Sequence, residues 1–121
     1  MERIETVEFT NMCMICDGSR VVVMEREKRD WPGVTFPGGH VEPGESFTDA
    51  VIREVPEKTR LTIRSPQLCG IKDWCENQCR FVVLLYKATC FDGELRSSPE
   101  GRVWWEDIAD LPKLKLSLDM R

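Results

Sequence analysis

The sequence has 121 residues, of which 41% are hydrophobic and 31% are charged, enough to build the core of one domain and too few for two. Its 17 Lys and Arg against 21 Asp and Glu give a net charge of −4, the opposite sign to that of most proteins that bind a polymeric nucleic acid. The longest apolar run, residues 81–86, is far shorter than the roughly 20 residues of a membrane span, and residues 1–5 carry no apolar stretch of a secretion signal. We therefore expect a single domain over residues 1–121 in the cytoplasm, with neither a membrane nor a polymeric nucleic acid as partner.

Apolar runs and turn residues predict a chain made mostly of strands. A hairpin turn is expected at residues 17–19, where Asp, Gly and Ser separate two apolar segments. Strands are expected at residues 7–15, 20–27, 34–36, 61–63, 67–74, 80–90 and 103–105.

One helix is predicted after the Gly- and Pro-rich loop at residues 37–44. Ser46 and Asp49 have the spacing of a capping box, which indicates a helix start. An apolar stripe that includes Val51 and Val55 follows at helical spacing. With one helix packed on strands, the predicted fold class is α+β.

The six cysteines allow more than one interpretation. Cys13 and Cys16 could form a zinc site together with Cys75 and Cys79. However, the first two lie in a predicted strand, where residues three apart point to opposite faces and do not converge. A disulfide framework belongs to exported chains, and nothing in the sequence indicates export. Buried or half-buried free thiols are therefore the expected state.

The loop before the predicted helix, and the helix itself, carry residues suited to phosphate chemistry. Gly38 and Gly39 let bare backbone approach a ligand or a cation. Glu54 and Glu57 lie three apart on one helix face, where carboxylates suit Mg²⁺ or Mn²⁺ and the phosphates that these ions bind. Arg53, four residues before Glu57, can pair with it. The pattern predicts a site at which a metal neutralises a di- or triphosphate and positions a water for attack.

This pattern resembles the signature of the Nudix hydrolases, and within that family the MutT-like group. The resemblance implies a mixed β-sheet with the motif's helix packed on one face, and a C-terminal helix that is short or missing here. It also implies a divalent ion on the carbonyl of Gly38 and the carboxylates of Glu54 and Glu57, substrate beside Gly39, and a loop and helix oriented by Glu45 and Arg53. The residues in register with the signature are Gly39, Glu45, Arg53, Glu54, Val55, Glu57 and Leu61.

The resemblance implies roles for further residues. Glu100 would be a metal ligand or a catalytic base, and Asp119 would accept hydrogen bonds from a purine edge. Arg26 and His40 would contact phosphate, and Trp74 is the best candidate among four tryptophans to stack on a base. Each has an alternative: a solvated side chain for the polar residues, and a core or rim position for Trp74.

Three positions depart from the signature. Lys58 stands in place of an acidic residue and, four residues after Glu54, can pair with it and oppose Mg²⁺. Pro56 costs roughly 3 kcal/mol in a helix interior, so the helix is expected to end or bend near Val55. Arg60 stands where the helix would end in the left-handed conformation, which Gly accepts more readily by about 1 kcal/mol. We therefore expect weaker metal binding and slower turnover than in a family member with an intact signature.

The resemblance implies hydrolysis of a purine nucleoside triphosphate, such as 8-oxo-dGTP, to the monophosphate and pyrophosphate. The alternatives are a catalytically weak or inactive nucleotide-binding domain, and a hydrolase of ADP-ribose or nucleotide sugars. The sequence ends at Arg121, where family members continue into a helix over the second face of the sheet, so Leu111, Leu114, Leu116 and Leu118 are left with little cover. A homodimer is therefore as reasonable an expectation as a monomer.

Overall fold

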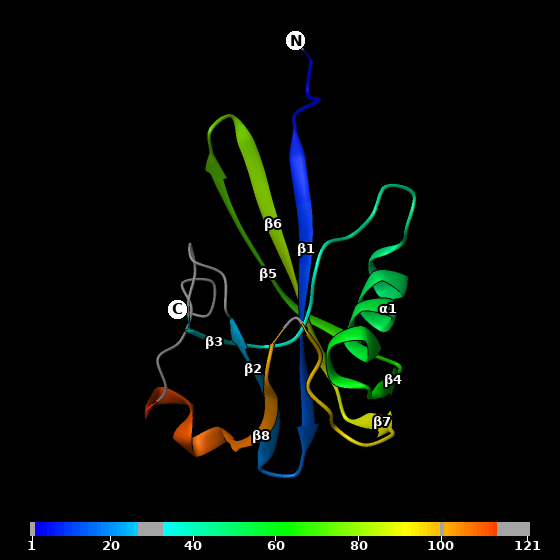
Figure 1. Ribbon diagram of the computed structural model, residues 1–121. Coiled ribbons are helices and arrows are strands. Elements are labelled where there is room, and N and C mark those ends of the chain that lie inside the picture. Colours follow the sequence, from blue (N-terminus) through cyan, green and yellow to red (C-terminus); the bar gives the residue numbers. More distant parts are fainter. Residues whose placement is uncertain (1, 27–32, 100, 114–121) are drawn as a thin grey trace.

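A computed structural model describes residues 2–26, 33–99 and 101–113 of the chain (Figure 1). Strand β1 (Val7–Asp17) turns at Gly18 and Ser19 into β2 (Arg20–Arg26), which confirms the predicted hairpin. The other strands are β3 (Gly33–Thr35), β4 (Thr62–Arg64), β5 (Gln67–Glu76), β6 (Cys79–Ala88), β7 (Cys90–Asp92) and β8 (Val103–Asp107). One α-helix, α1 (Phe47–Thr59), and one short 3₁₀ helix, η1 (Ile108–Lys113), complete the described elements.

The main sheet is mixed and has six strands. Its order is β3-β2-β1-β6-β5, with β8 also paired to β2, and a small second sheet joins β4 to β7. Strands β1 and β6 run parallel along nine paired residues, whereas the other pairs of the main sheet are antiparallel. With α1 packed against this sheet (Figure 1), the α+β class and the mixed sheet with one packed helix are confirmed. Residues 80–90, predicted as one strand, divide between β6 and β7.

The pairing of β1 leaves room for a loop beside it. Strand β2 pairs with β1 only next to the turn, where Cys16 faces Val21 and Asp17 faces Arg20. Further along, the same edge of β1 is bonded by the loop at residues 37–41, through three backbone hydrogen bonds of 2.8 to 2.9 Å. Because β2 separates from β1 beyond the turn, this edge of β1 is free to pair with the loop.

The sheet has a separate apolar cluster on each face. Cys13, Ile15, Val22 and Val55 belong to the cluster under α1, whereas Cys16, Val21 and Val23 belong to the other. The prediction that Cys13 and Cys16 point to opposite faces is therefore confirmed. Burial raises the pKa of the Cys13 thiol to about 12, so the thiol stays neutral in its cluster.

The prediction of buried or half-buried thiols is wrong for three of the six cysteines, which are exposed. Cys69 and Cys75 are exposed because they lie on β5, at the edge of the sheet, where only one side of the strand is covered. Cys90 is exposed on the three-residue strand β7.

Helix α1 begins where its capping box predicts and continues past the point where a break was expected. Ser46 is the N-cap, and its hydroxyl accepts a 3.1 Å hydrogen bond from the backbone N–H of Asp49. The helix was predicted to end or bend near Val55. The predicted end is wrong, because the helix runs through Pro56 to Thr59. The proline costs roughly 3 kcal/mol, but full burial of one valine stabilises by about 1.5–3 kcal/mol, and α1 buries both Val51 and Val55. Packing against the sheet therefore outweighs the local penalty.

The last described element covers part of the second face. Within η1, Leu111 packs against the cluster of Cys16, Val21 and Val23. Leu114, Leu116 and Leu118, expected to lack cover, lie outside the described residues. Among the helices of the described ranges, none is long and apolar enough to cross a membrane.

Candidate active site

The Gly38–Gly39 loop is pressed between β1 and α1. A Cβ on Gly38 would lie 2.0 Å from the backbone oxygen of Asn11, and a Cβ on Gly39 would lie 2.3 Å from Oε2 of Glu54. Only glycine fits at either position without a shift of its neighbours. The loop backbone thus lies directly against the carboxylate of Glu54.

Asn11 ties this loop to β1, a role that was not predicted from the sequence. Its backbone N–H donates to the carbonyl of Gly39 at 2.8 Å, and its Oδ1 accepts from the N–H of Gly39 at 3.1 Å. The side chain is buried, although its neighbours in β1 are mostly apolar. Asn11 shares its face of β1 with Phe9, Cys13 and Ile15, and a polar residue in this apolar alternation was the signal that could have identified it.

Arg53 joins the loop to the helix. Its guanidinium donates to both oxygens of Glu45, at 2.7 and 3.0 Å, and to the backbone carbonyl of His40 at 3.1 Å. A third nitrogen, Nη1, donates to Oε1 of Glu54 at 2.7 Å. Arg53, together with the backbone N–H of Glu42, holds the pKa of Glu45 below its usual value, and the two carboxylates raise the pKa of Arg53. This fork fixes Glu54 relative to the loop.

Glu54 is clamped between two cations. Its Oε1 receives Arg53, and its Oε2 lies 3.2 Å from Nζ of Lys58. The side chains of Glu54 and Lys58 are only 10% and 14% exposed, so little water screens the pair. The predicted pairing of Lys58 with Glu54 is confirmed.

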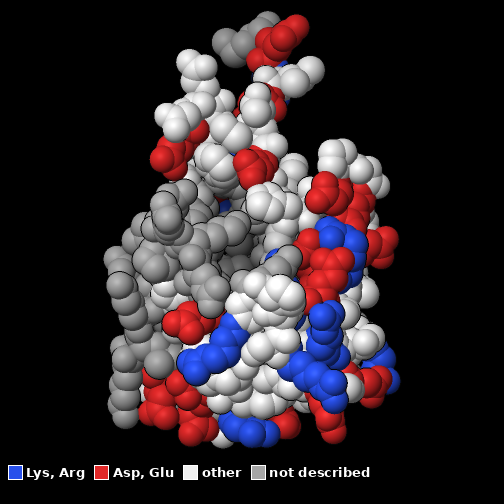
Figure 2. Space-filling view, in the orientation of Figure 1, with Lys and Arg blue, Asp and Glu red and all other residues white. Residues whose placement is uncertain are grey.

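Glu57 lies apart from this cluster. Its side chain is 53% exposed, and its Oε2 lies 3.7 Å from Nη1 of Arg53, so the predicted pairing with Arg53 is present but long. Figure 2 shows acidic side chains gathered over the loop and the start of α1, with Lys and Arg over the C-terminal half of the helix.

The oxygen donors have the chemical type that a divalent ion prefers, but cationic side chains already occupy the carboxylate of Glu54. Mg²⁺ and Mn²⁺ bind through the same carboxylate oxygens, so an ion at Glu54 would have to displace one of these cations. Both oxygens of Glu54 are paired, and the neighbouring Gly39 is flanked by the amide of Asn11. In the described part of the chain, no group of three or more His, Cys, Asp and Glu side chains is placed to hold a metal ion.

Two predicted substrate contacts lie on the other face of the sheet. His40 forms an isolated antiparallel β-bridge with Thr10, and its Nε2 lies 2.7 Å from Oε1 of Glu8. The side chains of Thr10 and Glu8 are on the face of β1 that points away from α1. Trp74 is paired across the strands with Phe81, and their rings stack with centroids 5.7 Å apart. The structure therefore brings neither side chain to Glu54.

Three other predicted residues fall outside what the structure describes. They are the side chain of Arg26, whose backbone pairs with Gly33 in β3, and the whole of Glu100 and Asp119.

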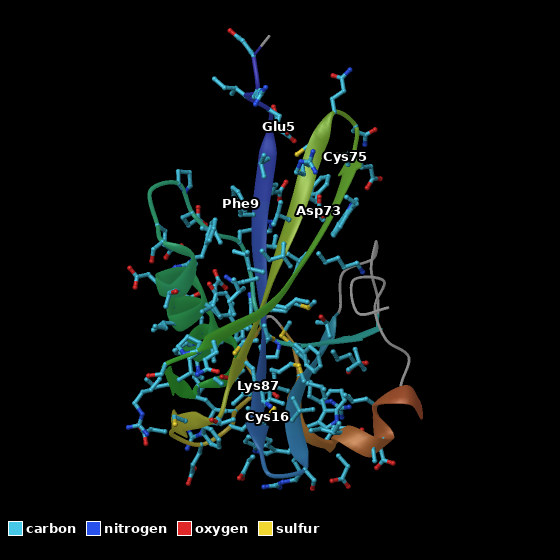
Figure 3. All side chains as sticks on the ribbon, turned by 180° about the vertical axis from the view of Figure 1, so that it is seen from behind. Glu5, Phe9, Cys16, Asp73, Cys75 and Lys87 are labelled. Carbon is cyan, nitrogen blue, oxygen red and sulfur yellow. The ribbon has the colours of Figure 1, made fainter. Side chains whose placement is uncertain are left out.

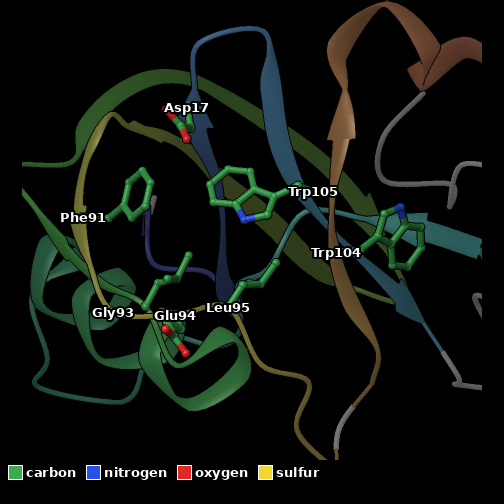
Figure 4. Close-up of a pocket in the computed structure, with 8 residues that line it drawn as sticks. Asp17, Phe91, Gly93, Glu94, Leu95, Trp104 and Trp105 are labelled. Carbon is green, nitrogen blue, oxygen red and sulfur yellow. The ribbon is translucent and has the colours of Figure 1, made fainter.

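A separate hollow of about 600 Å³ lies at the Asp17 end of β1 (Figure 4). Phe91 and Trp105 form its aromatic wall, with ring centroids 5.5 Å apart. The guanidinium of Arg20 lies 5.2 Å from the Trp105 ring and pairs with Asp17. Because β1 meets the loop at Asn11, six residues before Asp17, this hollow is distinct from the Gly39–Glu54 cluster.

Comparison with known proteins agrees with this geometry. The family model described as "NUDIX domain" matches residues 10–121. An uncharacterized Nudix hydrolase of Bacillus subtilis, YvcI, is 32% identical over 87% of this chain and 69% of its own length. An ADP-ribose pyrophosphatase of Methanocaldococcus jannaschii is 27% identical over 79% of this chain and 59% of its own length. The crystal structure of a MutT NUDIX hydrolase from Burkholderia pseudomallei superposes with a TM-score of 0.79 at 25% identity, covering 89% of this chain and 88% of that one.

A mixed sheet with one packed helix, and a Gly loop held to that helix by Arg53 and Glu45, define a phosphoanhydride hydrolase of the Nudix type. The chain belongs to the Nudix family, whose enzymes act on phosphorus anhydrides of nucleotide-like substrates and generally use divalent metal ions.

Proposed function

We propose that this chain hydrolyses a purine nucleoside triphosphate, 8-oxo-dGTP or a related nucleotide, to the nucleoside monophosphate and pyrophosphate. In this reaction a water oxygen forms a bond to phosphorus, the bridging P–O bond between the α- and β-phosphates breaks, its electron pair goes to the oxygen of the leaving phosphate, and a proton of the water is released to solvent. The observation that carries the proposal is the Arg53 fork, because it holds the Gly39 loop, Glu45 and Glu54 in one rigid cluster. The likeness to a MutT NUDIX hydrolase supports the MutT-like group, for which the resemblance of the sequence implies such a triphosphate.

For the cofactor we propose Mg²⁺ or Mn²⁺, with the carbonyl of Gly38 and the carboxylates of Glu54, Glu57 and Glu100 as its oxygen donors. The close approach of the Gly38–Gly39 loop to the carboxylate of Glu54 supports this set.

A second candidate function is that of a weak or inactive nucleotide-binding domain. The contact between Lys58 and Glu54 favours it, because the ammonium occupies a carboxylate that hydrolysis would need. A third candidate, hydrolysis of ADP-ribose or a nucleotide sugar, is favoured by the likeness to the ADP-ribose pyrophosphatase of M. jannaschii.

The three candidates are separated by chromatographic analysis of products from 8-oxo-dGTP, dGTP and ADP-ribose, each with Mg²⁺ or Mn²⁺. Release of a nucleoside monophosphate and pyrophosphate by the wild type, and its loss in Glu54→Gln, is the expected result. AMP from ADP-ribose alone would transfer the assignment to the third candidate. No product from the wild type or from Lys58→Glu, with nucleotide binding retained, would establish the binding domain and reject the hydrolase.

A further inference from the structure

Lys58 holds a carboxylate that the proposed function assigns to a divalent ion. It lies one helical turn after Glu54, with Nζ 3.2 Å from Oε2. Both side chains are largely buried, so the pair is shielded from salt and water. We propose that Lys58 is a resident counter-ion that a divalent ion must displace from Glu54, so that the chain without nucleotide holds no tight divalent ion there.

The surroundings of Glu54 favour the ammonium over a metal. Arg53 occupies the other oxygen at 2.7 Å, so the carboxylate already has two cationic partners. Asn11, which bonds the adjacent Gly39, has a buried Nδ2 with no hydrogen-bond partner among the described residues. The two groups that contact the oxygens of Glu54 are thus both N–H donors, whereas a divalent ion requires acceptors.

The charge balance makes Lys58 the decisive residue. Glu45, Glu54 and Glu57 carry three negative charges, and Arg53 and Lys58 carry two positive ones, which leaves one net negative charge. The substitution Lys58→Met leaves two net negative charges in this group, and Lys58→Glu leaves three. Arg53 is not an equivalent test, because its loss would also release Glu45 and the carbonyl of His40, and with them the loop, from α1.

The experiment is titration of the folded protein with Mn²⁺, without nucleotide, with free Mn²⁺ measured by electron paramagnetic resonance. Lys58→Met and Lys58→Glu are compared with the wild type and with Lys87→Met as a control. Lys87 pairs with Met14, on the face of the sheet away from α1, and lies near Cys16 (Figure 3). Its substitution removes the same charge without touching Glu54.

We expect the wild type and Lys87→Met to bind Mn²⁺ weakly and equally. Lys58→Met is expected to bind about tenfold more tightly or better, the scale on which partners of ligating groups tune metal affinity. A further Glu54→Gln substitution should remove that gain. Lys58→Met is the deciding variant because it adds no ligand, and circular dichroism with urea unfolding confirms that it is folded.

Equal Mn²⁺ affinity in the wild type and Lys58→Met overturns the inference, as does tight binding by the wild type that Glu54→Gln abolishes. The inference rests on the proposed function only in taking Glu54 as a metal ligand. Because Mn²⁺ binding requires no substrate, a gain in affinity without turnover would reject the proposed hydrolysis and retain the inference. Turnover by the wild type, together with equal Mn²⁺ affinities of the wild type and Lys58→Met, would reject the inference and retain the proposed hydrolysis.

Discussion

Arg60 ends α1 in the left-handed conformation. For a residue that has a Cβ, this conformation costs about as much free energy as one good hydrogen bond contributes. Its φ is 65° and its ψ is 9°, in the left-handed region, and its N–H donates to the carbonyl of Pro56 at 2.9 Å. The surroundings hold this geometry, because a Cβ on Gly93 would be 2.9 Å from the Arg60 oxygen and the N–H of Arg96 donates to the carbonyl of Thr59. Replacement of Arg60 by glycine should therefore relieve strain without moving the chain.

The expected gain follows from two opposing contributions. A residue with a Cβ in the left-handed region costs roughly 1–2 kcal/mol, and glycine loses an additional 0.5–1 kcal/mol of unfolded-chain entropy, which leaves a net gain of about 1 kcal/mol. The arginine side chain adds little to offset this, since its contact with the carbonyl of Glu57 is 3.5 Å long and exposed. For a domain of this size, the melting temperature should rise by about 4 °C.

The assay is urea unfolding followed by tryptophan fluorescence, with Arg60→Ala as the matched control. Alanine removes the same side chain but keeps the Cβ, so it should leave the free energy of unfolding close to that of the wild type. If glycine is no more stabilising than alanine, the left-handed strain at this cap is not what limits stability, and the reasoning is refuted.

Two further predictions concern the loop and its charges. Gly39→Ala should lower the free energy of unfolding by about 1–3 kcal/mol and reduce catalytic activity, because the new Cβ would meet Oε2 of Glu54; urea unfolding that matches the wild type would contradict the close approach. The pKa of Glu45 lies below its usual value of 4.5, chiefly through Arg53. The stability that Glu45 contributes is therefore present above that value and lost as the pH falls through the folded pKa, so the difference in urea midpoint between wild type and Glu45→Gln should shrink below about pH 4. A difference that stays constant from about pH 6 to pH 3 would show that the Glu45–Arg53 pair does not contribute.

Local features were predictable from residues near one another in the chain. The hairpin at Gly18 and Ser19, the helix start at Ser46 and the left-handed cap at Arg60 were all expected and are all present. The contact between Lys58 and Glu54 was predictable for the same reason, since residues four apart on a helix are neighbours. Each of these depends on the chemistry of a few consecutive residues.

The remaining features depend on which strands pair, and periodicity alone does not determine that. The continuation of α1 through Pro56 follows from burial of Val51 and Val55 on the sheet, which outweighs a local penalty that the sequence shows by itself. The exposure of Cys69 and Cys75 follows from the edge position of β5.

The candidate site divides in the same way. Its motif, the positions of Arg53, Glu54 and Glu57 and the conflict at Lys58 are visible in the sequence. The roles of Asn11 and the placement of His40 on the opposite face were decided by the alignment of the Gly loop with β1, which lies more than 20 residues earlier in the chain. Contacts between distant segments are set by how the whole sheet packs, because burial rewards the complete arrangement and not any one segment.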